Sequence, residues 1–322
     1  MSRSEELRVS AGSATLVATL TLPDAPPPPD RRGRYPNALL LPSWLPRDRD
    51  GAYDVAGHPD WFASGPTPPG ILARLAGALA ERGVASLRAD PRGCGTSDGA
   101  WEEVDLFTRI DDARDMLAAM RSDGRLDLRR SGMVGHGEGA TIALAVAIGD
   151  PAVSALTLIS PAARSWRTTL RRAAAARRRD GDQRHPLVAA IDRWSEDLIE
   201  RAERREQSFN LWLHGGGMLT IRLAGFEQAI TTPPLALATM LHRSVALVHG
   251  SHDTWSQADE SALLARSLAS AGEAPSVRVV AGAGHDLAEA GDQIIGELAD
   301  DLAARLLPIE LPPVLVAIDE MG

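Results

Sequence analysis

Apolar residues along this chain alternate between runs of strand length and stretches with helical spacing. The strand-like runs are Leu7–Ser10, Ala14–Leu22, Ala38–Leu41, Val84–Ala89, Ser131–Gly135, Ala155–Ser160, Ser244–His249 and Ser276–Val280. Helical spacing covers Ile71–Arg82, Phe107–Arg121, Ala140–Ile148, Ala258–Ala271 and Ile294–Leu306. The first two runs flank Gly12 and predict an antiparallel pair. Because strands that alternate with helices build parallel sheets with both faces covered, the rest of the pattern predicts an α/β fold.

Two segments interrupt this alternation. Prolines concentrate between Pro23 and Pro36, and because proline has no N–H to give to a β-ladder, we expect a surface loop there. From Pro161 to Met240 the sequence is rich in Arg and Ala, is helical in pattern, and is broken by Gly215–Gly217 and Pro233–Pro234. This second segment predicts a helical cap inserted after the sixth strand.

The predicted organisation is one domain with an insertion, which a chain of 322 residues accommodates. Residues 1–160 form the first part of the core, 161–240 the cap, 241–306 the second part of the core, and 307–322 a C-terminal tail. Within the tail, Pro308–Ile318 is apolar. Pairing with a sheet edge, binding to a partner and folding back on the domain all stay open for it.

The sequence G-H-G-E-G at residues 135–139 lies between a predicted strand and a predicted helix. This frame matches the nucleophile elbow G-x-S-x-G, in which a sharp turn holds a serine hydroxyl above the sheet. Gly137 stands at the serine position and has no hydroxyl. We expect a positive φ at Gly137, and we expect the missing side chain to leave space for a water or a substrate group.

Four motifs occur in order along the chain: P-S-W-L-P-R-D-R-D-G at 42–51, R-A-D-P-R-G-C-G-T-S at 88–97, H-G-S-H-D at 249–253 and G-A-G-H at 282–285. They resemble those of the α/β-hydrolase superfamily, and specifically of its serine-aminopeptidase-like esterase branch. The corresponding motifs of that branch are P-G-S-G-P-x-D-R-D-G, R-x-D-x-R-G-x-G-x-S, H-G-x-x-D and G-x-G-H or G-x-x-H. The resemblance covers about Leu7 to Leu306 apart from the cap, and it implies a mostly parallel sheet with helices on both faces.

The resemblance also implies a catalytic site, because the nucleophile, the acid and the base of this fold follow one another along the chain. Gly137 then stands at the nucleophile position, Asp253 is the acid, and His285 is the general base. The backbone N–H groups of Trp44 and Glu138 correspond to the oxyanion hole.

Further residues are expected near this site. Those expected to line the substrate pocket are Ser43, Leu45, His136, Trp166 and Trp255. Ser43 and Leu45 stand where the resembled branch has glycines in its oxyanion loop. His136 and Glu138 flank the elbow, where packing and the helix dipole explain them without a catalytic role. Glu138 as a surrogate acid or base is the alternative.

Arginines gather in the predicted cap at positions 164, 167, 171, 172, 177, 178, 179 and 184. They could recognise an anionic substrate, such as a carboxylate or the phosphate of a carrier arm. They could also form the solvated face of a helix, paired with Asp180, Asp182 and the acidic stretch Glu196–Glu206. The pattern favours the solvated face.

Composition excludes several kinds of chemistry. All 34 basic residues are arginine, which removes lysine Schiff bases and lysine general bases. The one cysteine, Cys94, excludes a disulfide framework and Cys-rich zinc or iron–sulfur sites, and it has no neighbouring base to activate it. His249, His252 and Asp253 lack a further ligand nearby in sequence, so we expect no metal. We also expect no cofactor.

Charge and terminal sequence limit the partners. A net charge of −9 argues against nucleic acid as a partner. The N-terminus lacks the apolar core of a signal peptide, and no run approaches the roughly 18 apolar residues of a membrane span. We therefore expect a soluble, cytoplasmic protein with a small-molecule substrate, with an anionic or carrier-linked compound as one option and a homodimer left open.

Because loss of a nucleophilic serine typically lowers the rate about a millionfold, Gly137 leads to three hypotheses. In the first, the protein is an enzyme that acts on a small acyl or carbonyl-containing molecule through the Asp253–His285 base without a serine nucleophile, as a lyase, cyclase or isomerase or by direct water attack. In the second, the natural protein is a serine esterase or peptidase, and Gly137 is an engineered replacement. In the third, the protein is a binding pseudoenzyme, which the presence of both Asp253 and His285 disfavours.

Overall fold

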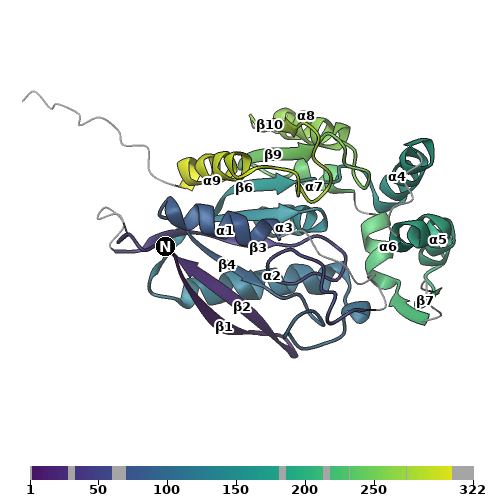
Figure 1. Ribbon diagram of the computed structural model, residues 1–322, viewed down its shortest axis with the longest axis horizontal. Coiled ribbons are helices and arrows are strands. Elements are labelled where there is room, and N and C mark those ends of the chain that lie inside the picture. Colours follow the sequence, from purple (N-terminus) through teal and green to yellow (C-terminus); the bar gives the residue numbers. More distant parts are fainter. Residues whose placement is uncertain are drawn as a thin grey trace, which may run out of the picture.

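The computed structural model describes residues 2–27, 33–59, 70–180, 186–212, 218–231, 233–272 and 274–306. Within these ranges, one sheet has the strand order β1–β2–β4–β3–β5–β6–β9–β10 (Figure 1). The bounds are β1 Arg3–Ala11, β2 Ala14–Leu22, β3 Tyr35–Leu41, β4 Ala85–Ala89, β5 Leu126–His136, β6 Val153–Ile159, β9 Ser244–Gly250 and β10 Ser276–Val280. β1 and β2 form an antiparallel pair, β2 is antiparallel to β4, and the other neighbours run parallel.

Helices cover both faces of this sheet. α1 (Ile71–Glu81) and α9 (Asp292–Leu306) pack together on one face, and α2 (Leu106–Ser122), α3 (Glu138–Gly149) and α8 (Asp259–Ser270) cover the other. A short 3₁₀ turn, η2, spans Trp101–Glu103. Along β3, Leu39 and Leu41 belong to the core under α2 and α3, whereas Ala38 and Leu40 belong to the core under α1 and α9. Because successive strand residues face opposite sides, a strand buried on both faces reads as one continuous apolar run.

The residues between β6 and β9 form a separate group of elements, which we call the insertion (residues 161–240). Its elements are α4 Trp166–Asp180, α5 Pro186–Glu203, β7 Ser208–Trp212, β8 Met218–Arg222, α6 Ala224–Thr231 and α7 Pro234–Ala238. Figure 1 shows α4, α5, α6 and β7 together at one end of the molecule, away from α9. The mostly helical pattern predicted here did not include strands, but β7 and β8 pair as an antiparallel hairpin. The alternation of Phe209 and Leu211, both buried, is the strand signal that the helical pattern obscured.

The proline-rich loop also needs correction at its end, because Pro36 lies inside β3. The pairing of β3 with β5 shifts register between Tyr35 and Asn37. Pro36 therefore sits at an irregularity of the ladder, one of the few strand positions that proline tolerates. β1 begins at Arg3, earlier than the apolar pattern shows, because its outer residues are polar.

Some predicted features lie outside the described residues: Pro28 and Pro29, Gly215–Gly217, Arg184 and the tail at 307–322. Within the described parts of the chain, the predicted mostly parallel sheet with helices on both faces is confirmed. No helix among them has both the length and the apolar character needed to cross a membrane.

Candidate active site

The predicted elbow is a tight turn from β5 into α3. Gly137 lies between the two with φ of 54° and ψ of −115°, a backbone conformation that side-chain-bearing residues rarely adopt. A Cβ on Gly135 would lie 2.3 Å from the carbonyl oxygen of Gly139. A Cβ on Gly139 would lie 2.6 Å from the carbonyl oxygens of both Leu41 and Pro42. The outer glycines of the motif thus allow the turn to close and the end of β3 to lie against α3.

The elbow does not leave an empty space beside the base, contrary to expectation. A Cβ placed on Gly137 would lie 2.1 Å from Ser43 Oγ, 2.9 Å from Ser43 Cβ and 3.0 Å from His285 Nε2. Ser43, in the loop after β3, therefore fills the volume that the elbow side chain would take. Its Oγ lies 3.4 Å from His285 Nε2. The physical reason is that the loop carries a side chain where the resembled branch has a glycine.

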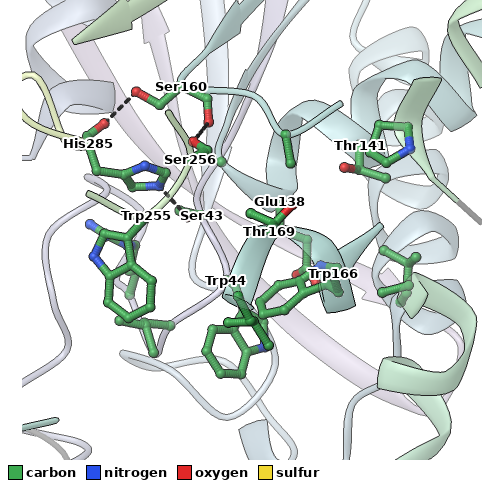
Figure 2. A pocket seen from close by; sticks show the side chains of 18 residues that line it. Ser43, Trp44, Glu138, Thr141, Ser160, Trp166, Thr169, Trp255, Ser256 and His285 are labelled. Atoms are coloured by element: carbon green, nitrogen blue, oxygen red, sulfur yellow. Dashed lines mark hydrogen bonds between the residues drawn. The ribbon is translucent and has the colours of Figure 1, made fainter. Parts of the chain in front are cut away.

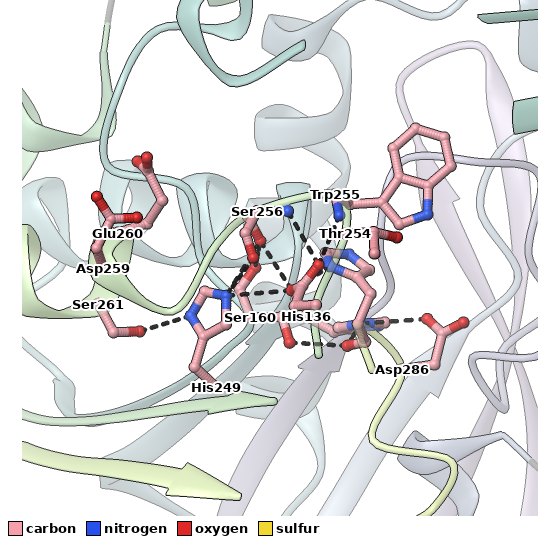
Figure 3. A network of polar contacts seen from close by, with 12 residues as sticks. His136, Ser160, His249, Thr254, Trp255, Ser256, Asp259, Glu260, Ser261 and Asp286 are labelled. Atoms are coloured by element: carbon pink, nitrogen blue, oxygen red, sulfur yellow. Dashed lines mark hydrogen bonds and ion pairs between the residues drawn. The ribbon is translucent and has the colours of Figure 1, made fainter. Parts of the chain in front are cut away.

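His285 and Asp253 form a hydrogen-bonded pair. His285 Nδ1 donates to Asp253 Oδ2 over 2.8 Å, and Asp253 Oδ1 accepts the backbone N–H groups of Trp255 at 2.7 Å and Ser256 at 3.0 Å. His249 Nε2 lies 3.1 Å from Oδ2 and completes the network in Figure 3. Burial by itself would raise the pKa of Asp253, but the charge of His285 and the hydrogen bonds from His249 and His285 hold it well below its usual range.

The pairing with Asp253 also changes the pKa of His285. Burial by itself would lower the pKa of His285, but the Asp253 carboxylate outweighs burial, so the pKa lies above its ordinary value. Because Nδ1 donates to Asp253, Nε2 is the nitrogen that accepts a proton, and it faces Ser43.

The backbone of His285 is held by two further side chains. Its carbonyl oxygen accepts hydrogen bonds from Ser160 Oγ at 2.7 Å and from His136 Nε2 at 3.0 Å. Burial lowers the pKa of His136 to about 3, so its imidazole is neutral at pH 7. Ser160 and Leu287 both have a φ of 48° without being glycine. Backbone strain is thus concentrated around the base, as is common at functional sites.

Glu138 is not a free acid or base at the elbow. Its carboxylate accepts from Arg109 Nη1 over 2.9 Å, and the same Nη1 lies 3.3 Å from the carbonyl oxygen of Trp44. Burial raises the pKa of Glu138, and Arg109 opposes that rise. The guanidinium therefore connects the first residue of α3 to the loop after β3, the two segments whose N–H groups were expected to form the oxyanion hole.

A pocket opens above the elbow, between the sheet and the insertion (Figure 2). The predicted residues that line it are Ser43, Trp44, Leu45, Gly137, Glu138, Trp166, Trp255 and His285. Asp253 and His136 lie behind the imidazole of His285, which both contact. The space between these residues, including the part open to solvent, is about 770 Å³.

Aromatic side chains form one wall of this pocket. The rings of Trp44 and Trp166 meet edge to face with centroids 4.7 Å apart, and Phe226 packs against both at 5.4 and 5.6 Å. Trp166 and Phe226 belong to α4 and α6, so the insertion supplies part of the pocket. On the other side, Trp255 lies under the guanidinium of Arg177 at 4.7 Å.

Five of the arginines that the sequence groups in this segment are paired within the chain. Ion pairs join Arg164 and Arg172 to Asp259, Arg167 to Glu203, Arg171 to Glu196, and Arg177 to Asp192. Arg177 is 2% exposed at its side chain and also donates to the carbonyl of Thr254 over 2.7 Å. The solvated face favoured from the sequence is therefore wrong for Arg177, which instead connects α4 and α5 to the loop that carries Asp253.

Two groups of potential metal ligands occur among the described residues. In the first, Asp54 already accepts the N–H groups of Gly57 and Gly95 and contacts His58 beside Cys94. Burial raises the pKa of the Cys94 thiol to about 12, so the thiol is protonated at pH 7 in this environment and is not a nucleophile.

The second group is His136, His285 and Asp286. Asp286 accepts from Arg47 Nη2 over 2.8 Å, and His136 Nε2 faces the carbonyl oxygen of His285, so these groups already have partners. The Arg47–Asp286 pair also connects the loop after β3 to the loop that carries the base.

Sequence reasoning did not identify four residues that support the site: Arg109, Ser160, His249 and Ser256. They come from α2 and from the strand ends and loop around Asp253 and His285. No spacing rule relates Arg109 and Ser160 to the site, whereas His249 is the first residue of the motif that ends at Asp253, and Ser256 lies three residues after Asp253. By contrast, serine at 43 in place of a family glycine and glycine at 137 in place of the family serine were both visible in the motifs, and Ser43 was expected only to line the pocket.

The structure is similar to solved esterases and related hydrolases. It superposes on Est1E from Butyrivibrio proteoclasticus, solved with ferulic acid, with a TM-score of 0.62 and 16% identity over 92% of this chain and 99% of that chain. The α/β-hydrolase GrgF from Penicillium sp. sh18 gives a TM-score of 0.62 and 16% identity over 94% of this chain and 99% of that chain. At these identities the likeness concerns the fold alone.

Sequence comparison gives a partial relative and a family. The acyltransferase drtE of Aspergillus calidoustus is 35% identical over 82 residues, which are 25% of this chain and 27% of that protein. The match therefore spans about a quarter of each protein. The pattern of the family described as serine aminopeptidase, S33, matches residues 69–290, well over half of the chain. Together with the sheet topology and the elbow, this match shows that the chain belongs to the serine aminopeptidase S33 family of α/β-hydrolases.

Proposed function

We propose that this protein is an enzyme that hydrolyses or transfers the acyl group of a small, uncharged, largely apolar molecule, with His285 as the general base. The observation that carries the proposal is the 2.8 Å hydrogen bond from His285 Nδ1 to the buried Asp253, which leaves Nε2 directed at the pocket. A carboxylate in this position fixes the tautomer of the imidazole and stabilises the imidazolium formed when a proton is taken.

The walls of the pocket support an uncharged substrate. Arg47, which lines the pocket, is 3% exposed and paired with Asp286. Arg164 and Arg172 of the insertion are paired with Asp259. An anionic or carrier-linked substrate would have to displace such partners, whereas the indoles offer apolar surface directly.

We further propose that the insertion acts as a cap over this site. Its Trp166 and Phe226 pack on Trp44 of the loop after β3, so the insertion and this loop share one aromatic cluster. A wall of this kind excludes water from the reacting groups.

The elbow glycine bears on the three hypotheses drawn from the sequence. An engineered loss of a serine at 137 fits poorly, because the Cβ of that serine would lie 2.1 Å from Ser43 Oγ and Ser43 would have to move. A pseudoenzyme fits poorly because Asp253 is buried and hydrogen-bonded to the imidazole of His285. A base that works without a serine at the elbow therefore remains, acting on water, on a substrate group or on another hydroxyl.

The test uses a panel of p-nitrophenyl esters and thioesters of increasing acyl length and His285→Ala. We expect turnover by the wild type and a loss of about 10²- to 10⁴-fold in kcat/KM in the variant. His242→Ala is the matched control, because His242 is exposed and lies two residues before β9, at the opposite end of that strand from Asp253. Equal rates for His285→Ala and the wild type, or no turnover of any acyl compound by the wild type, would contradict the proposal.

A further inference from the structure

We propose that Ser43 is the nucleophile of this enzyme and replaces the serine that is absent from the elbow. The inference rests on the proposed function, because it names the group from which His285 takes a proton. Ser43 Oγ lies 3.4 Å from His285 Nε2, as the dashed line in Figure 2 shows. Hydrogen bonds between a nucleophile and its base are often of this looser length in the absence of substrate.

The positions of Ser43 and of an elbow side chain exclude each other. The Cβ of any residue at 137 other than glycine would lie 2.1 Å from Ser43 Oγ and 2.9 Å from Ser43 Cβ. The hydroxyl of Ser43 therefore occupies the same volume, on the same side of the imidazole, as the side chain of an elbow nucleophile. Glycine at 137 is what makes room for it.

The loop that carries Ser43 is fixed against α3. A Cβ on Gly139 would lie 2.6 Å from the carbonyl oxygens of Leu41 and Pro42, so the backbone directly before Ser43 lies against the first turn of α3. That turn begins with the N–H groups of Glu138 and Gly139, which lie at the positive end of the helix dipole. An oxyanion formed by attack of Ser43 on a carbonyl group would develop close to these donors.

Two arginines fix the loop on its other side. Arg109 Nη1 lies 3.3 Å from the carbonyl oxygen of Trp44, directly after Ser43. Arg47 Nη2 donates to Asp286, directly after His285, over 2.8 Å. Ser43 is 9% exposed and lines the pocket. Its hydroxyl is thus held between the base and the substrate space.

The chemistry balances as an acyl-enzyme reaction. The Oγ–H proton of Ser43 moves to His285 Nε2 while Oγ bonds to the acyl carbon, and the carbonyl electron pair moves onto its oxygen. When that pair returns, the bond to the leaving alcohol or thiol breaks, and the leaving group takes the proton from Nε2. A water or acceptor alcohol then gives a proton to Nε2, attacks the acyl carbon and releases Ser43, which recovers the proton.

Covalent labelling tests the inference without knowledge of the substrate. The wild type is incubated with a fluorophosphonate probe, and the adduct is located after digestion with trypsin. Cleavage after Arg34 and Arg47 releases peptide 35–47, in which Ser43 is the one serine. We expect one adduct per chain, on this peptide, that is lost in His285→Ala and in Ser43→Ala. An unlabelled wild type, or an adduct on another peptide, would overturn the inference.

Kinetics separates this inference from the proposed function. Ser43→Ala should fold, because it removes one atom, and should lose at least about 10³-fold in kcat/KM toward an activated ester. The double variant Ser43→Gly with Gly137→Ser has the family's glycine at 43 and serine at 137. It should recover part of that loss and move the label to residue 137. Ser270→Ala, at an exposed helix end, is the control and should match the wild type. Turnover that needs His285 but persists in Ser43→Ala would indicate direct attack by water, which overturns this inference and leaves the proposed function standing.

Discussion

Gly137→Ala adds a single methyl group to the elbow. It tests whether Ser43 occupies the volume that a side chain at residue 137 would take. The new Cβ would lie 2.1 Å from Ser43 Oγ and 2.9 Å from Ser43 Cβ. Rotation of the Ser43 side chain can move Oγ away, but Ser43 Cβ can move only if the backbone of the loop moves. The elbow and the loop must therefore shift relative to each other, or the methyl group must be accommodated under strain.

The expected loss of stability has two parts. A φ of 54° costs a residue other than glycine about 1 to 3 kcal/mol. Overpacking against Ser43 adds about 1 to 3 kcal/mol. Ser43→Gly in the same chain removes the second part, so the double variant should be about 1 to 3 kcal/mol more stable than the sum of the single changes indicates.

Urea unfolding of the wild type, both single variants and the double variant measures this coupling. Gly12→Ala is the control for the backbone part alone, since Gly12 has a φ of 55° and its nearest neighbour to an added Cβ is Arg92 Nη2 at 3.7 Å. Effects that add to within about 0.5 kcal/mol would refute the argument that residues 43 and 137 share one space.

Two further predictions concern the charges around the site. In the wild type, kcat/KM rises with pH as His285 loses its proton, because the neutral imidazole is the base; Asp253→Asn removes the charge that raises the pKa of His285. Its pH profile should therefore shift to lower pH while the maximal rate falls by up to about 10⁴-fold, and an unshifted midpoint would contradict the pairing. Arg109→Ala should lower the free energy of unfolding in urea by about 3 to 5 kcal/mol, because it leaves the carboxylate of Glu138 buried without its cation. Adding Glu138→Gln should recover most of that loss, and equal losses in the single and double variants would count against it.

The fold was predictable because its signal is periodic and local. Strands buried on both faces gave continuous apolar runs, such as Ala38–Leu41, and the helices between them showed helical spacing. The hairpin of β7 and β8 was missed because its strands are short and only Phe209 and Leu211 alternate clearly. Pro36 was placed in a loop because the rule for proline holds for regular ladders, and an irregular register is visible only once the partner strand is known.

The site was predictable only where it follows the family motifs. Asp253 and His285 stand at fixed places in their motifs, so their meeting was expected before the fold was known. Ser160 and Arg109 reach the site through packing of distant segments, and no local pattern marks them. Ser256 lies three residues after Asp253 and hydrogen-bonds to it through both its N–H and its hydroxyl. The Arg177 side chain was placed in solvent because a run of arginines is usually a solvated face. Burial against Trp255 and Asp192 depends on how α4 and α5 lie over the core.

A nucleophile on a loop depends on different contacts from a nucleophile on an elbow. An elbow serine is held by the strained turn that carries it, so its position follows from β5 and α3 alone. Ser43 belongs instead to the loop after β3, and its distance from His285 depends on the contact of that loop with Gly139 and on its tie to Arg109. A nucleophile at Ser43 therefore makes the reaction rate more sensitive to these contacts than to strain at Gly137, whose remaining task is to stay without a side chain.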